Sequence, residues 1–214
     1  LISMKGHNLR TYIGNHLLDV ERTINDLKNR DVVERIWAKD YTVWRPEQRE
    51  ISDRLGWLNV AEHMSHELPS IESFADEVKP SGYKQIVLIG MGGTSLGSEV
   101  LCKTLTLDRR SPTLTVLDST VPARVREVTE TIDITNTLFL VSSKSGETIE
   151  SLLLYKYFRD LVDRVVGQSG AGRHFVAITD AGTPLEELAL EQGFRRIFTN
   201  PKDIGGRYSV LSYF

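Results

Sequence analysis

The sequence is poor in cysteine, in net charge and in long apolar runs. Cys102 is its single cysteine, which excludes an internal disulfide and favours a reducing compartment. The 26 Lys and Arg residues against 29 Asp and Glu give a net charge of -3, so there is no overall positive field to attract nucleic acid or anionic lipid. No apolar run approaches the ~18 residues of a membrane span. We therefore expect a cytoplasmic protein that binds neither nucleic acid nor membrane.

The overall composition and the length of the sequence are typical of a folded globular chain. The hydrophobic share of 40% and the charged share of 26% are close to globular averages, which excludes disordered and collagenous classes. A length of 214 residues suits one large domain with a helical extension. The chain starts at Leu1 without Met and stops at Phe214 directly after an apolar pair, so we expect it to be a piece of a longer polypeptide, truncated on its C-terminal side.

The first 79 residues have helical patterns. Apolar residues recur at steps of three or four between Leu9 and Leu27, which predicts an amphipathic helix that runs to about Arg30. Helical spacing resumes at Ile51, and residues 71–78 predict another short helix. No stretch before residue 80 is typical of a strand. We expect a helical N-terminal segment over residues 1–79.

From residue 80 onward, short apolar runs alternate with amphipathic stretches, which is the pattern of βαβ units. The predicted strands are residues 85–89, 114–117, 137–141, 175–179 and 196–198, and the predicted helices are residues 96–105, 122–131, 148–166 and 184–192. Residues 80–214 are therefore expected to form an α/β domain with a doubly wound parallel sheet of about five strands. Ligands of such sheets lie at the carboxyl ends of the strands.

The first predicted strand runs into the glycine-rich turn G-M-G-G-T-S-L-G at residues 90–97. Its glycines let backbone N–H groups approach an anion at a helix N-terminus, and this favours a phosphate or sugar-phosphate site that includes Gly93 and Thr94. A dinucleotide fingerprint would need glycine where Ser95 stands, and a Walker lysine is missing. Nicotinamide binding and a purely structural small turn remain as the alternatives.

The third predicted strand ends in S-S-K-S-G-E-T at residues 142–148, again directly before a helix. The hydroxyls of Ser143, Ser145 and Thr148 can join backbone amides around a phosphate, and Lys144 adds a positive charge. Helix capping is the alternative, but it needs only one hydroxyl. The sequence predicts a second phosphate-binding loop here.

The run D-I-G-G-R-Y-S at residues 203–209 presents Arg207 after a paired glycine. A guanidinium has a fixed fork of donors that suits an oxyanion, although an exposed structural arginine is the alternative. His63 and His66 lie three residues apart, but no third ligand is evident and we predict no metal site.

Taken together, these three motifs resemble the sugar isomerase (SIS) domain, and specifically the phosphoglucose isomerase family. The run G-G-R-Y-S is similar to a signature of that family, whereas the related amidotransferases usually carry Gln where this chain has Lys144. The resemblance covers about residues 84–214. A weaker resemblance of residues 36–40 and 54–58 is to the isomerase part of bacterial transaldolase–isomerase fusions.

The resemblance implies interconversion of glucose 6-phosphate and fructose 6-phosphate through an enediol or enediolate, with no metal or organic cofactor. It implies that Arg207 stabilises negative charge on the enediolate and that the whole protein is a homodimer. It also implies that the substrate phosphate is held by Thr94, Ser143, Ser145 and Thr148, with Gly93 and Lys144 lining the same pocket. The family's base glutamate and ring-opening histidine come from later motifs, so this chain alone is expected to be inactive. A non-catalytic SIS-type sensor of sugar phosphates is the alternative.

Overall fold

The structure is a computed structural model that describes residues 14–105 and 111–214, with only the backbone of Arg207. The chain divides into two compact units, Leu1–Ser52 and Asp53–Phe214, which we describe separately. Within the described residues, no helix is long and apolar enough to cross a membrane.

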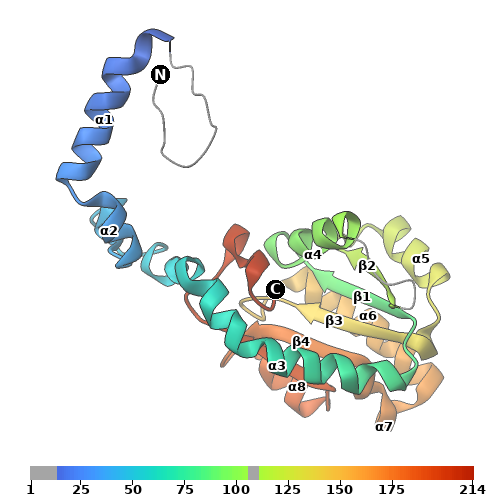
Figure 1. Ribbon diagram of the computed structural model, residues 1–214. Helices are drawn as coiled ribbons and strands as arrows, with labels where there is room; N and C mark the ends of the chain where they lie inside the picture. Colours follow the sequence, from blue (N-terminus) through green and yellow to red (C-terminus); the bar gives the residue numbers. More distant parts are fainter. Residues whose placement is uncertain (1–13, 106–110) are drawn as a thin grey trace. The chain divides into compact units, whose positions relative to one another are not determined.

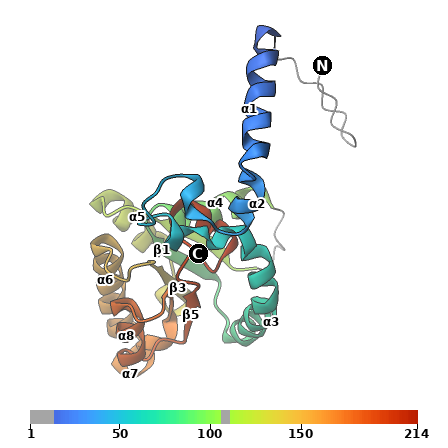
Figure 2. The same cartoon turned by 90° about the vertical axis from the view of Figure 1, so that its left-hand side faces the viewer.

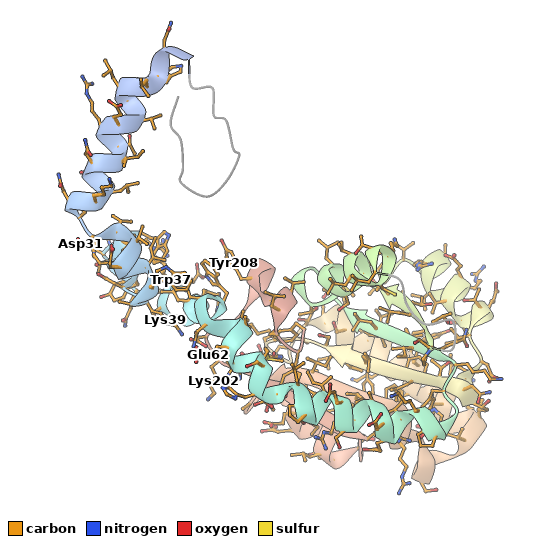
Figure 3. The ribbon with its side chains drawn as sticks, in the orientation of Figure 1. Asp31, Trp37, Lys39, Glu62, Lys202 and Tyr208 are labelled. Atoms are coloured by element: carbon orange, nitrogen blue, oxygen red, sulfur yellow. The ribbon has the colours of Figure 1, made fainter. Side chains whose placement is uncertain are left out.

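The described part of the first unit is helical. Its elements are η1 (Gly14–His16), α1 (Leu17–Asn29), α2 (Val32–Trp37) and η2 (Tyr41–Val43). The predicted helix that ends near residue 30 is confirmed as α1, while its expected first turns at residues 9–13 lie outside the described residues. Asp31, labelled in Figure 3, separates α1 from α2 with a left-handed φ of 48°.

The second unit contains a five-stranded parallel sheet, which confirms the predicted fold class. The strands are β1 (Gln85–Gly90), β2 (Thr113–Leu117), β3 (Thr137–Ser142), β4 (Phe175–Asp180) and β5 (Arg196–Asn200). Their order is β2-β1-β3-β4-β5, and all neighbours pair in parallel. This is the doubly wound order of flavodoxin-like folds.

The helices that follow the strands also lie where the periodicity predicts them. They are α4 (Gly93–Thr104), α5 (Pro122–Thr131), α6 (Ile149–Val166) and α8 (Pro184–Glu191). The short helix α7 (Gln168–Ala171) lies outside the predicted ranges. The remaining elements are 3-10 segments: η3 (Ser52–Asn59), which begins at the boundary between the units, η4 (Lys79–Ser81), η5 (Ile134–Asn136), η6 (Gly172–His174) and η7 (Gly206–Leu211).

The helix before the sheet is longer than the sequence predicts. We expected a short helix at residues 71–78, whereas α3 runs from Val60 to Val78 with Pro69 inside it. A proline inside a helix removes one hydrogen bond and costs about 3 kcal/mol. Packing on both sides of it offsets that cost: Val60 and Met64 are buried against Ile204, and the C-terminal part of α3 covers the sheet.

Two hydrophobic cores lie on the two faces of the sheet. Helices α5 to α8 cover one face, where the buried side chains include Val87, Val128, Phe139, Phe158, Phe175 and Leu185. Helix α3 and the C-terminal residues cover the other face, where Leu138, Val176, Ile178, Phe198 and Phe214 are buried. Figures 1 and 2 show α3 on one side of the strands and α6 and α8 on the opposite side. The strands are therefore buried between two helical layers, as a parallel sheet requires.

The second core is tied to α3 by a hydrogen bond between Tyr213 and Glu67. The Tyr213 hydroxyl donates to Glu67 Oε2 at 2.7 Å. Burial, together with this bond to a carboxylate, raises the pKa of Tyr213 to about 12.

We expect Tyr213→Phe to lower the free energy of unfolding by about 1 kcal/mol at pH 7, because it removes this bond. The stabilisation is fully present below the ordinary tyrosine pKa of about 10 and is lost as the pH rises to about 12, since the unfolded chain ionises first. Urea unfolding of both proteins at several pH values checks this. A difference between the two that does not shrink above pH 10 would contradict it.

Candidate functional site

The carboxyl ends of β1 and β3 meet at the topological switch point of the sheet. The register pairs Gly90 with Ser142, so the last residues of the two strands lie side by side. The chain then leaves β1 into α4 and β3 into α6. These helices pack on opposite faces, and a crevice is left between the two loops.

A cavity of about 520 Å³ occupies this crevice. It is lined by Arg54, Met91, Gly93, Thr94, Ser142, Ser143, Lys144, Ser145, Thr148, Asp180, Ala181, Thr183 and Lys202. All six residues predicted to surround a phosphate, Gly93, Thr94, Ser143, Lys144, Ser145 and Thr148, are among them. The structure thus brings the two predicted loops together around one space.

The glycine-rich turn after β1 is held tightly against the sheet. Gly92, with φ of 66°, precedes the first residue of α4. A Cβ on Gly90 would lie 2.8 Å from Thr94 Oγ1, so glycine is needed for Thr94 to come this close to the strand. The Thr94 hydroxyl donates to the Met91 carbonyl at 3.1 Å, and the buried Ser95 hydroxyl donates to the Gly92 carbonyl at 3.1 Å. Ser95, the residue that breaks the dinucleotide fingerprint, therefore closes the turn.

The loop after β3 is stabilised by hydrogen bonds of its own Ser and Thr hydroxyl groups. Ser143 Oγ and Thr148 Oγ1 lie 3.0 Å apart, and Ser145 Oγ accepts a hydrogen bond from the Glu147 amide at 3.2 Å. Thr148 is in the N-cap position of α6, yet its side chain makes no capping hydrogen bond. Capping therefore does not account for this hydroxyl, which pairs with Ser143 at the cavity wall.

Lys144 is the most tightly held cation of the cavity wall. Its Nζ forms an ion pair with Asp180 at the end of β4 and donates to the Lys202 carbonyl at 3.1 Å. A Cβ on Gly205 would lie 2.7 Å from Lys144 Cε, so the lysine stem passes directly over this glycine. The extended side chain thus connects the β3 loop with the segment after β5, where Lys202 is labelled in Figure 3.

Asp180 and Arg54 are site residues that the sequence motifs did not identify. Burial raises the pKa of Asp180, while the hydrogen bond and the charge of Lys144 act in the opposite direction. The polar end of β4 could have indicated Asp180, because it reaches the same sheet edge as the two loops. Arg54 lies in η3, before the sheet, and no local pattern connects it with a site.

Arg207 lies in η7, and its side chain is outside what the structure describes. The backbone around it is well anchored to the glycine-rich turn. Ser209 Oγ donates to the Gly93 carbonyl at 3.2 Å, and Val210 packs so closely on α4 that a Cβ on Gly97 would lie 2.2 Å from Val210 Cγ2. The G-G-R-Y-S segment therefore lies against the start of α4, beside the cavity.

The cavity carries a positive electrostatic balance among its described lining residues. Arg54, Lys144 and Lys202 contribute cations, and Asp180 contributes a carboxylate. The N-termini of α4 and α6 add favourable potential for an anion. Within residues 14–105 and 111–214, no three His, Cys, Asp or Glu side chains are grouped as a metal site would require. The arrangement is suited to hold a small anion such as a phosphate group.

Residues 58–214 match the phosphoglucose isomerase family. This range includes β1, β3, both loops and the G-G-R-Y-S segment. The chain belongs to the phosphoglucose isomerase family. Both loops that line the cavity, residues 90–97 and 142–148, lie within the matched range.

Individual relatives agree with this membership. The chain is 30% identical over 203 residues to the glucose-6-phosphate isomerase of Mycoplasmopsis pulmonis, covering 91% of this chain and 47% of that protein. It is 32% identical over 168 residues to the glucose-6-phosphate isomerase of Staphylococcus haemolyticus, covering 75% of this chain and 38% of that protein. The chain thus spans half or less of the length of these relatives.

Two solved structures share the fold. A hypothetical protein of Thermus thermophilus superposes with a TM-score of 0.72 at 27% identity, covering 92% of this chain and 44% of that one. A glucose-6-phosphate isomerase of Chlamydia trachomatis superposes with a TM-score of 0.68 at 21% identity, covering 92% of this chain and 40% of that one. The second likeness concerns the fold alone.

Proposed function

We propose that this chain provides the phosphate-binding part of a glucose-6-phosphate isomerase, which interconverts glucose 6-phosphate and fructose 6-phosphate through an enediol or enediolate. The observation that carries the proposal is the convergence of both predicted phosphate loops on one cavity at the switch point of the sheet. Residues 80–214 correspond in this proposal to the SIS domain, and the whole protein is a cytoplasmic homodimer.

In this mechanism the loop residues fix the phosphate end of the sugar. The hydroxyls of Thr94, Ser143, Ser145 and Thr148 and the amides at the starts of α4 and α6 donate to phosphate oxygens. Gly93 and Lys144 line the same pocket. Fixing the phosphate places the sugar carbons in one position, so that proton transfer between C1 and C2 becomes effectively unimolecular. This interaction is made equally in the ground state and in the transition state.

Arg207 has a different role in the proposal. The resemblance of the G-G-R-Y-S segment to the family signature assigns its guanidinium to the reacting end of the substrate, where it stabilises the negative charge of the enediolate. A hydrogen-bond donor that interacts with a charge present only in the transition state lowers the activation barrier of the reaction and does not change the dissociation constant of the substrate. The reaction moves a proton within one substrate, so the proposal includes no redox cofactor.

A non-catalytic sugar-phosphate-binding module is the second candidate, and one observation favours it for this chain taken alone. Moving the proton needs a general base, usually a carboxylate. Among the described residues that line the cavity, the carboxylate is Asp180, which is engaged by Lys144. Glu147 is exposed and is not among the lining residues. We therefore expect the chain alone to bind sugar phosphate without isomerising it.

Calorimetric titration of the chain with fructose 6-phosphate tests the proposal, with NAD as the counter-ligand. We expect one molecule of fructose 6-phosphate to bind and NAD not to bind. Binding of NAD alone would overturn the isomerase assignment. A coupled assay on the whole protein separates the two candidates, since both predict that the chain alone is inactive, whereas turnover of fructose 6-phosphate by the whole protein would exclude the binding module.

A further inference from the structure

Lys144 is held in place from outside its own loop. Its ammonium group contacts Asp180 at the end of β4 and the Lys202 carbonyl after β5, and its stem lies over Gly205. The backbone supports the same arrangement, because the Asp180 amide donates to the Lys144 carbonyl at 3.3 Å. One lysine side chain thus spans three consecutive strand ends.

Asp180 is an unusual residue to find in a cavity suited to an anion. Its side chain is 14% exposed, and its Oδ1 atom is buried without a hydrogen-bond partner among the residues that the structure describes. A carboxylate here repels an incoming phosphate, and its own burial is costly. Coulomb's law alone therefore predicts that Asp180 weakens the binding of any anion.

The flexibility of the Lys144 side chain explains why a carboxylate at this position is useful. Lysine has a flexible four-carbon stem, and fixing such a side chain on binding costs conformational entropy. This cost is avoided on substrate binding if the ammonium group is already held at the cavity wall in the free protein. It also keeps the β3 loop and the segment that leads to Arg207 at a fixed distance from each other.

We propose that Asp180 is a positioning residue that holds the Lys144 ammonium group against the segment after β5, ready for the phosphate of the substrate. This inference rests on the proposed function. It assigns to Asp180 a net favourable effect on sugar-phosphate binding, opposite in sign to its direct electrostatic effect.

A double-mutant cycle with fructose 6-phosphate as the titrant separates the two effects. We expect Asp180→Asn to bind about fivefold more weakly than the wild type, because Lys144 loses its ionic partner. In a Lys144→Met background, the added Asp180→Asn change is expected to strengthen binding, because only the repulsion is then removed. A residue that merely supported the fold would weaken binding in both backgrounds.

Asp163→Asn is the matched control. Asp163 forms an ion pair with Arg159 on α6 at 2.8 Å, with side chains 25% and 13% exposed, similar to the Asp180 and Lys144 pair. We expect this variant to bind as the wild type does. Thermal unfolding of every variant shows whether a loss of binding follows from a loss of folding.

A second measurement tests the position of Lys144 without any ligand. Acetylation by a water-soluble N-hydroxysuccinimide ester, followed by mass spectrometry, reports how accessible each lysine amine is. Lys144 is expected to react more slowly in the wild type than in Asp180→Asn, while the reactivity of Lys156 stays the same. Equal rates at Lys144 would overturn the inference.

The outcomes distinguish this inference from the proposed function. If the wild type binds fructose 6-phosphate and Asp180→Asn binds it equally or more tightly, Asp180 does not position Lys144 and the phosphate site remains. If the wild type binds no fructose 6-phosphate, the proposed function is overturned, and the inference with it.

Discussion

Gly146→Ala is expected to lower the free energy of unfolding by about 3 kcal/mol and to abolish sugar-phosphate binding, since left-handed backbone and crowding each cost about 1–2 kcal/mol. Gly146 has φ of 68° in the loop after β3. A Cβ there would lie 2.7 Å from the Leu185 amide nitrogen and 2.8 Å from Thr183 Cβ. The backbone at the start of α8 has little freedom to give way, so the loop itself must move.

Gly193→Ala separates crowding from backbone strain. Gly193 has a similar φ of 63°, but within the described part of the chain no atom beyond its two sequence neighbours lies within 4 Å of the position of its Cβ. We expect this control to lose about 1 kcal/mol and to keep its binding of fructose 6-phosphate. Urea unfolding and calorimetry measure both effects. Equal losses of stability in the two variants would contradict the role assigned to the contact with α8.

Replacing both Ser143 and Thr148 by alanine is expected to weaken fructose 6-phosphate binding on the order of 100-fold, since a hydrogen bond to a charged group contributes about 1.5 kcal/mol. The two hydroxyls lie 3.0 Å apart, and both line the cavity. Their pairing in the free protein is exchanged for contacts with phosphate oxygens, so we expect only about 1 kcal/mol of stability to be lost.

The matched control for this variant removes two hydroxyls that do not line the cavity. Ser65 donates to the Glu62 carbonyl in α3, and Thr104 donates to the Val100 carbonyl in α4. Ser65→Ala combined with Thr104→Ala is expected to leave the dissociation constant unchanged in calorimetry. An unchanged dissociation constant for the Ser143 and Thr148 double variant would remove these hydroxyls from the proposed phosphate site.

The predicted strands and helices of the α/β part are confirmed, most of them to within one or two residues at each end, because their signal is local. Helix α5 covers residues 122–131 as predicted, and β1 extends one residue beyond the predicted range. The prediction was wrong in length at α3. The short helix predicted at residues 71–78 is the last part of a longer helix, because the contacts of Val60 and Met64 with Ile204 extend it through Pro69.

At the candidate site, too, the sequence predicted the residues that belong to local motifs and missed residues that tertiary contacts bring to the cavity. Gly93, Thr94, Ser143, Lys144, Ser145 and Thr148 were predictable because each belongs to a short motif between a strand and a helix, and the carboxyl ends of parallel strands share one edge. Their role as phosphate ligands stays a prediction, as does the role of Arg207. Arg54 and Asp180 belong to no such motif, and only the folded chain places them at the cavity.

Patterns in the amino-acid sequence were enough to predict the fold class, the positions of the strands and helices and the two loops, because periodicity and turn chemistry act over a few neighbouring residues. The folded chain was needed to show which strands are neighbours and which residues surround Lys144. The order β2-β1-β3-β4-β5 brings together residues that are 36 and 58 positions from Lys144 in the chain. Contacts at that separation depend on the packing of whole elements, and no local pattern of residues encodes them.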